Sequence, residues 1–250
     1  MATDDPRDRG AEDRPPDDFQ SFMNLLNELK ATGCNLLVVG DASRELFTRA
    51  SSQLLGDADV LRHRVLAVTD ATPNSIAERL PDPAETPRPL TETTRVLNHA
   101  EAPRSVTATT SPDAPPKLAG IEEVRIADPE LAGLQSALCE AIDAVAADAT
   151  RLKPADLRVG IDSLAPLLDH YDADVVAQCL DAVGERVDAH DAMAHYLLPR
   201  AYDDDAVQRF VPHVDAVVEL RAVDPEAYGH DVQQRWHVPR RDVETEWTPL

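Results

Sequence analysis

Lysine and aromatic residues are scarce in this sequence of 250 residues. Lys30, Lys117 and Lys153 are the only lysines among its 24 basic residues, and aromatic residues make up 4% of the chain. No run or stripe of Lys and Arg offers the phosphate contacts on which nucleic-acid binding depends. The sequence therefore predicts no nucleic-acid partner.

Long apolar runs are missing as well. The sequence contains no apolar stretch of about 18 residues, the length that a helix needs to span a bilayer. The acidic start, MATDDPRDRGAEDRPPDD, lacks the apolar segment of a signal peptide. We therefore expect no membrane partner and a cytoplasmic location. Cysteine is also sparse: Cys34, Cys139 and Cys179 lie in apolar stretches without CxxC spacing. This pattern predicts buried, reduced thiols rather than a metal or redox centre.

Acidic residues are abundant instead. The 46 Asp and Glu residues give the chain a formal net charge of −22. This acidic, lysine-poor and aromatic-poor composition resembles that of proteins from halophiles that accumulate salt, such as haloarchaea. At about 1 M salt the Debye length is only about 3 Å, so like charges on the surface repel one another weakly. We interpret the acidity as a means of staying soluble in brine rather than as a surface for a basic partner.

Short apolar strands alternate with helical patterns over most of the chain. Residues 1–17 mix acids, arginines and prolines and are expected to form a disordered tail. Residues 18–250 are expected to form one domain, which opens with a helix that ends at Gly33. The predicted strands are Leu36–Val39, Arg64–Asp70, and the segments IEEVRIADPE, LRVGIDSL, AMAHYLLP, VDAVVELR and DVQQRWHVP.

The composition of these strands indicates the fold class. Most are apolar on both faces, which favours a mostly parallel sheet covered by helices on both sides. The last two strands are close in sequence and are predicted to pair as a hairpin, the second of them at the edge. The expected fold is therefore α/β, with three α/β/α layers and a C-terminal antiparallel edge.

Prolines interrupt this pattern between residues 80 and 118. They stand at Pro81, Pro83, Pro87, Pro89, Pro103, Pro112, Pro115 and Pro116. We expect a long surface excursion that contains one short strand near TRVLNH. A loop of this length in a compact domain is either functional or disordered.

Polar residues gather where the predicted strands end. Ligands of open α/β sheets bind outside the carboxyl ends of the strands. One candidate ligand crevice therefore combines Gly40, Asp41, Ser43, Arg44, Asp70, Asp162 and Ser163. Three of these residues are aspartates, so the crevice could serve a sensor for a small cationic or metal-bridged ligand.

The segment LRVGIDSLAPLL, residues 157–168, resembles the Walker B strand of RecA-type ATPases of the KaiC group, in which an apolar strand ends in Asp-Ser-Leu. The order that follows is also similar: a long helix, the apolar strand Met193–Pro199, a short acidic stretch, VDAVVELR, and a final strand with Arg235 and Trp236. The segment RVLAVTD matches the second strand of that group. This resemblance covers roughly residues 19–238 outside the excursion, and it implies a RecA-like fold with ATP and Mg²⁺ as the family's ligands.

The phosphate site of that family is incomplete in this sequence. A P-loop needs glycines whose N–H groups wrap phosphates, a Lys, and a Ser or Thr for Mg²⁺. The segment GDASRELF, residues 40–47, offers one glycine, no lysine, and the carboxylate of Asp41, which repels a phosphate. The electrostatic stabilisation of phosphoryl transfer is therefore lost. The sequence predicts a degenerate family member without Walker A and without a cofactor, which acts as a regulatory or scaffold module for an unidentified protein partner.

Two alternatives stay open. One is weak ATPase activity, or nucleotide binding without turnover, and the other is the small-ligand sensor described above. Self-assembly into a homo-oligomer, as in the presumed relatives, also stays open.

The carboxylate of Asp162 has two interpretations. It could bind Mg²⁺ through water, as the matching family position does, or Asp162 or Ser163 could cap the next helix. Because no partner lysine exists, we favour the cap, and the same interpretation applies to Asp41 and Ser43 before the helix that begins near Ser43. His195 lies inside an apolar strand and is expected to be a hydrogen-bonded structural histidine.

Overall fold

A computed structural model describes residues 17–70, 72–99, 115–126, 130–149 and 151–250. The predicted tail lies outside these ranges except for Asp17, which begins the first helix, α1 (Asp17–Thr32). Gly33 follows α1 with a positive φ of 77° and joins the helix to the first strand.

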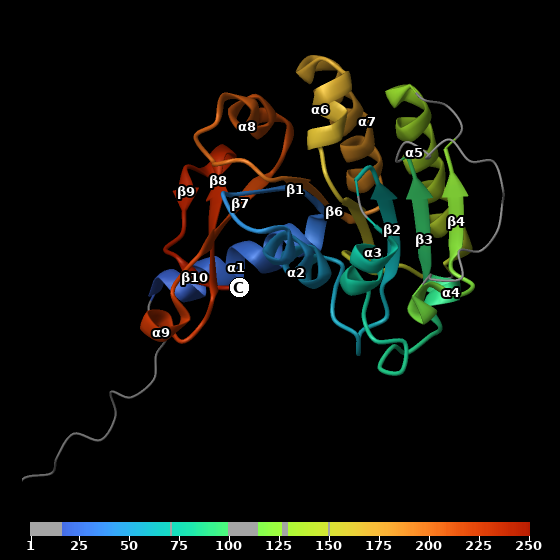
Figure 1. The fold of residues 1–250 in the computed structure, drawn as a ribbon, viewed down its shortest axis with the longest axis horizontal. Coiled ribbons are helices and arrows are strands. Elements are labelled where there is room, and N and C mark those ends of the chain that lie inside the picture. Colours follow the sequence, from blue (N-terminus) through green and yellow to red (C-terminus); the bar gives the residue numbers. More distant parts are fainter. Residues whose placement is uncertain (1–16, 71, 100–114, 127–129, 150) are drawn as a thin grey trace, which may run out of the picture.

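The strands of the described residues form one sheet of ten strands (Figure 1). Its spatial order is β10 (Thr248–Pro249), β8 (Val232–Val238), β7 (Ala216–Ala222), β1 (Cys34–Val39), β6 (Met193–Leu198), β5 (Leu157–Ile161), β2 (His63–Val68), β3 (Thr94–Asn98) and β4 (Glu122–Arg125), and β9 (Val243–Glu244) also pairs with β8. All pairs from β7 to β4 are parallel, whereas β8 runs antiparallel to β7. The predicted hairpin and the predicted fold class are confirmed.

Helices cover both faces of the sheet. One face carries α5 (Leu131–Asp148), α6 (Ala165–His170), α7 (Ala173–Ala189) and α8 (Asp205–Phe210). The other carries α1, α2 (Arg44–Leu54) and α3 (Pro73–Arg79). The remaining short elements are α4 (Leu90–Thr93), α9 (Pro225–Tyr228), and the 3₁₀ turns η1 (Pro116–Leu118), η2 (Val211–His213) and η3 (Pro239–Arg241). None of the described helices is both long and apolar enough to cross a bilayer.

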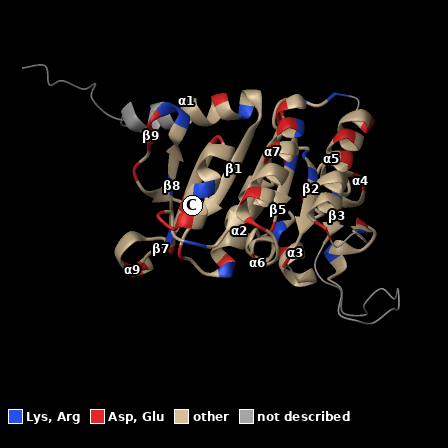
Figure 2. Cartoon of the chain, turned by 90° about the horizontal axis from the view of Figure 1, so that it is seen from above, with Lys and Arg blue, Asp and Glu red and all other residues tan. Residues whose placement is uncertain are grey.

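The apolar face of α5 forms the centre of the largest core cluster. Its apolar residues recur at helical spacing and are buried at every position: Leu131, Leu134, Leu138, Ile142 and Val145. Acidic residues lie on the outer sides of α5 and α7 (Figure 2). The three cysteines are free thiols, and burial raises the pKa of both Cys34 and Cys179 to about 12. Among the described residues, no group of three or more His, Cys, Asp and Glu side chains could hold a metal ion.

The proline-rich excursion is less of a surface loop than the sequence suggests. The short strand predicted near TRVLNH is confirmed as β3, but it lies inside the sheet between β2 and β4. Leu80, Leu90, Val96 and Leu97 are buried against neighbouring elements. The prolines conceal this pattern because they break the periodicity on which the prediction rests.

The strand DVQQRWHVP also differs from expectation. It is β8, and the predicted edge is covered by two short strands, β9 and β10, from the end of the chain. Their two residues each are too few to show an alternating pattern in the sequence.

Candidate functional site

The turn after β1 is short and closely packed. Residues 40–43 alone separate β1 from α2. Gly40 has a φ of +141°, and a Cβ placed there would lie 2.2 Å from the carbonyl oxygen of Leu220 on β7. Its N–H donates to the carbonyl oxygen of Arg200 at 2.7 Å. Gly40 therefore allows the turn to pack closely against β7, and its N–H is already hydrogen-bonded within the protein.

Arg44 ties the start of α2 to the end of β2. One of its Nη atoms donates to the carbonyl oxygen of Asp70 at 2.8 Å, and the other lies 3.5 Å from the Asp70 carboxylate. Both side chains are more than half exposed. Asp41 is exposed. Ser43 holds the N-cap position of α2 as predicted, but its side chain makes no capping hydrogen bond.

Asp162 lies at the end of β5 and is 4% exposed. Its Oδ1 accepts from the backbone N–H of Thr69 at 2.6 Å and lies 2.8 Å from the Thr69 hydroxyl, while Oδ2 accepts from the N–H of Asp70 at 3.3 Å. We call this arrangement the Asp162 clasp. It joins β5 to the chain leaving β2, so the carboxylate neither caps the next helix nor opens into solvent.

Ser163 lies one residue before Leu164, which is the N-cap residue of α6 and makes no side-chain capping hydrogen bond. The Ser163 Oγ accepts from the N–H of Ala165, the first residue of α6, at 3.2 Å. The Thr69 hydroxyl also lies 2.5 Å from the Ser163 carbonyl oxygen. Ser163 therefore bonds to the start of the helix, but neither Asp162 nor Ser163 holds the predicted N-cap position.

Arg79 supplies the nearest buried positive charge. Its side chain is almost fully buried, and one Nη donates to the Ser75 carbonyl oxygen at 2.8 Å. Burial lowers the pKa of Arg79, and the charge of Asp162 opposes that shift. Burial likewise raises the pKa of the Asp162 carboxyl, against the hydrogen bonds from Thr69 and the charge of Arg79. The two groups therefore compensate each other inside the protein.

Thr69 and Arg79 are the site residues that sequence reasoning missed. Thr69 lies within the predicted strand Arg64–Asp70, where nothing in the local sequence marks it as a site residue. Its hydrogen-bond partner, Asp162, is 93 residues away. Arg79 did carry a signal, because it follows Ile76 by three positions and so shares its buried helix face.

His195 lies below this edge in the core. Its Nε2 is 2.8 Å from the Ser51 hydroxyl, and both residues are buried. Burial, with the nearby charges of Arg79 and Arg158, lowers the pKa of His195 to about 3. A neutral, hydrogen-bonded structural histidine is what the sequence predicted.

The carboxyl edge as a whole does not fit a nucleoside triphosphate with Mg²⁺. The Gly40 N–H is bonded to Arg200, Asp41 brings negative charge to the turn, and both oxygens of Asp162 accept hydrogen bonds from the protein. Among the candidate residues, Asp70 contacts both Arg44 and Asp162, whereas Gly40 and Asp162 also bond to residues outside the predicted set.

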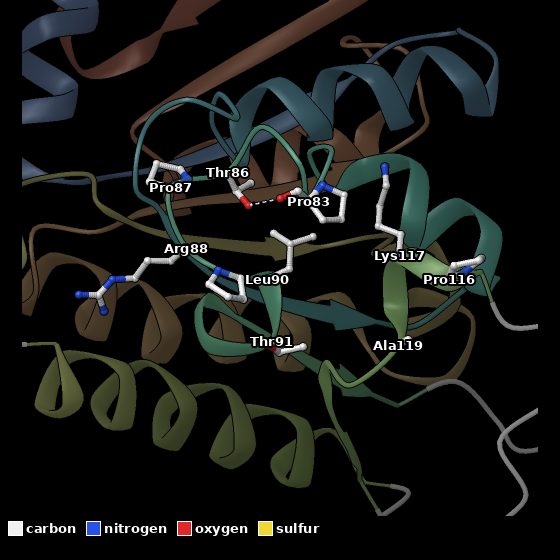
Figure 3. A pocket seen from close by; sticks show the side chains of 10 residues that line it. Pro83, Thr86, Pro87, Arg88, Leu90, Thr91, Pro116, Lys117 and Ala119 are labelled. Carbon is white, nitrogen blue, oxygen red and sulfur yellow. Dashed lines mark hydrogen bonds between the residues drawn. The ribbon is translucent and has the colours of Figure 1, made fainter.

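Two cavities of about 350 Å³ each lie away from this crevice, and neither is lined by its candidate residues. The first, the proline hollow, has Pro83, Pro87, Pro89 and Pro116 around Leu90 (Figure 3). The second, the arginine cavity, is lined by Arg88, Arg95 and Arg151 together with His63, Glu122 and Asp148. The proline hollow is built largely from the excursion that the sequence assigned to the surface, and the arginine cavity takes six of its thirteen lining residues from it.

The fold and these contacts define an α/β/α protein with a mostly parallel sheet, at whose carboxyl edge Asp162 and Arg44 are bonded within the protein. The model of a family of unknown function (DUF7504) matches residues 33–220, which is more than half of the chain. The chain belongs to that family. The match runs from Gly33, next to β1, to Leu220 in β7, so α1 and β8 lie outside it. A search of curated proteins finds no match.

Proposed function

We propose that this protein is a RecA/KaiC-like module that retains the fold and has lost ATP hydrolysis. In this proposal it works in the cytoplasm of a halophilic archaeon as a regulatory or scaffold module that binds another protein. The Asp162 clasp is the observation that carries the proposal.

The clasp matters because of what the resemblance implies for Asp162. The matching family position holds Mg²⁺ through water, which requires carboxylate oxygens that face the ligand site. Here the carboxyl is 4% exposed and accepts from Thr69 and Asp70. Recruiting Asp162 to a cation would leave the buried Thr69 N–H without its acceptor, at a cost of about 1–3 kcal/mol.

The turn at residues 40–43 supports the same proposal. A phosphate cradle uses several free backbone N–H groups and a lysine. The N–H of Gly40 is bonded to Arg200, and Arg44 is bonded to Asp70. A domain with such a turn can still present its surfaces to a partner, which is the role left to a fold without turnover.

Phosphate release from Mg-ATP tests the loss of hydrolysis. The full chain is assayed in multimolar KCl, beside the Asp162→Asn variant and a protein-free blank. We expect both proteins to release phosphate at the blank rate. Saturable release by the wild type that disappears in Asp162→Asn would overturn the proposal.

The partner is tested separately. The tagged full chain is used to capture proteins from a halophile lysate at native salt, and light scattering of the same preparation reports whether copies self-assemble. We expect one partner in fixed proportion to the bait. Repeated capture of nothing but the bait, as a monomer, contradicts the scaffold role.

A further inference from the structure

The arginine cavity lies at the edge of the sheet opposite the Asp162 clasp. His63, Arg95 and Glu122 line it from the first residues of β2 and from the starts of β3 and β4. Val145 and Asp148 contribute from the end of α5. At about 350 Å³, the cavity matches the lower range of small-molecule sites.

Arg95 is already neutralised. Its guanidinium lies 3.2 Å from the carboxylates of both Glu122 and Asp148. These contacts use up two of the three carboxylates that line the cavity. Arg95 therefore shapes the wall and leaves little charge for a ligand.

Arg88 and Arg151 differ from Arg95. Both are exposed, and neither forms an ion pair or hydrogen bond within the described part of the chain. Figure 3 shows the Arg88 side chain running away from the proline hollow, whose wall it shares with the arginine cavity. Two guanidinium groups at one cavity thus keep all their donors available.

The lining carries three arginines and three carboxylates, so its formal charges cancel. Glu122 and Asp148 both contact Arg95, however, and among the described residues neither forms an ion pair with Arg88 or Arg151. Glu92 supplies one negative charge to the lining. The C-terminus of α5 adds about half a negative charge. Arg88 is also the strongest charge acting on His63, where it adds to burial in lowering the pKa, while Asp156 opposes it. Arg64 and Arg95 act on His63 in the same direction as Arg88, so arginine charge prevails at this wall of a cavity whose lining is formally neutral.

We propose that the arginine cavity binds a small anion bearing a phosphate or carboxylate group, held by Arg88 and Arg151. Guanidinium forks match the paired oxygens of both groups. The inference does not depend on the proposed loss of ATP hydrolysis, because it concerns residues at the other edge of the sheet.

Calorimetric titration of the full chain at constant KCl tests the site, with inorganic phosphate and succinate as separate probes. We expect saturable binding of at least one probe at a single site, and the better probe identifies the ligand group. Arg88→Gln and Arg151→Gln should each weaken that binding about tenfold or more, since a charged hydrogen bond contributes about 1.5–3 kcal/mol.

Three further variants sharpen the result. Arg209→Gln changes an exposed arginine of α8 that does not line the cavity, and it should leave binding within about twofold. Arg44→Gln changes an exposed arginine at the carboxyl edge, and it should also leave binding within about twofold. Glu92→Gln should strengthen binding of an anion, whereas it would weaken binding of a cationic or zwitterionic ligand.

The outcomes are decisive in both directions. Loss with Arg88→Gln and Arg151→Gln together with a gain with Glu92→Gln supports the site. No saturable binding of either probe to the wild type overturns it, and so does an equal loss with Arg209→Gln or Arg44→Gln. Urea unfolding of each variant confirms that these exposed substitutions leave the fold intact.

Discussion

The two edges of the parallel sheet differ in whether the charged groups proposed for ligand binding already have partners within the protein. At the carboxyl edge, Asp162 is bonded to Thr69, and Arg44 is bonded to Asp70. At the amino edge, Arg88 and Arg151 face a cavity without an ion-pair partner among the described residues. Strand direction alone would place the ligand at the carboxyl edge. Which edge remains available is instead decided by which polar groups are already satisfied.

The largest predicted effect concerns the turn that closes the carboxyl edge. Gly40→Ala should cost at least about 3 kcal/mol or prevent folding, because its Cβ would meet the Leu220 carbonyl oxygen at 2.2 Å and φ is +141°. Gly229→Ala is the matched control, since its φ is +74° with no atom within 4 Å. It should cost only about 1–2 kcal/mol. Equal urea midpoints for the two variants would refute the role of the Leu220 contact.

The next largest predicted effect concerns the Asp162 clasp. Asp162→Ala should lower the free energy of unfolding by about 2–4 kcal/mol, because buried donors of Thr69 and Asp70 lose their acceptor. Asp162→Asn keeps an oxygen for Thr69, but it offers Asp70 a donor in place of an acceptor and removes the charge that compensates Arg79. It should therefore cost about 1–2 kcal/mol, less than Asp162→Ala. Urea denaturation measures both. If the Asn variant were as unstable as the Ala variant, the negative charge rather than the acceptor would be what the fold needs.

His195 lies between the two edges, within the field of Arg79 from one and Arg158 from the other. Its folded pKa is about 3 against an ordinary value of 6.5, so below pH 6.5 the unfolded chain takes up a proton that the folded chain refuses. Stability must therefore fall as the pH drops from 6.5 toward 3, and by about 2 kcal/mol at pH 5. Urea unfolding of the wild type at pH 7 and pH 5 should show this loss of stability. In His195→Gln the loss between the two pH values should be smaller by about 2 kcal/mol. An identical pH dependence in the two proteins would be inconsistent with a neutral buried His195.

The exposed ion pairs give the smallest effect. Arg44→Gln should change the free energy of unfolding by less than about 0.5 kcal/mol, because the Arg44–Asp70 pair is long and more than half exposed. Arg95→Gln should cost more, up to about 1 kcal/mol, because Arg95 is less exposed and contacts two carboxylates. Urea midpoints compare them directly. The reverse order would mean that the carboxyl edge relies on Arg44 more than its geometry indicates.

Much of the architecture could be predicted from local patterns. The stripe on α5, the hairpin of β7 and β8, and the parallel direction of most strands follow from periodicity, from closeness in sequence and from which strands are apolar on both faces. The position of β3 inside the sheet could not be predicted, although the strand itself was, because its pairing with β2 and β4 joins segments that are separate in the sequence. The candidate crevice stays a prediction, and the sequence could not show that Asp162 is bonded to Thr69, because Thr69 is far away in sequence.

The sequence by itself determined the helices and strands, the α/β class, the acidic surface and the missing lysine of the turn at Gly40, because each depends on residue type or on spacing within one segment. The tertiary structure alone decided that Asp162 is clasped, that Arg79 is buried beside it, and that Arg88 and Arg151 meet at one cavity. A hydrogen bond or a shared cavity depends on which distant segments the sheet order brings together, and no local pattern encodes that order.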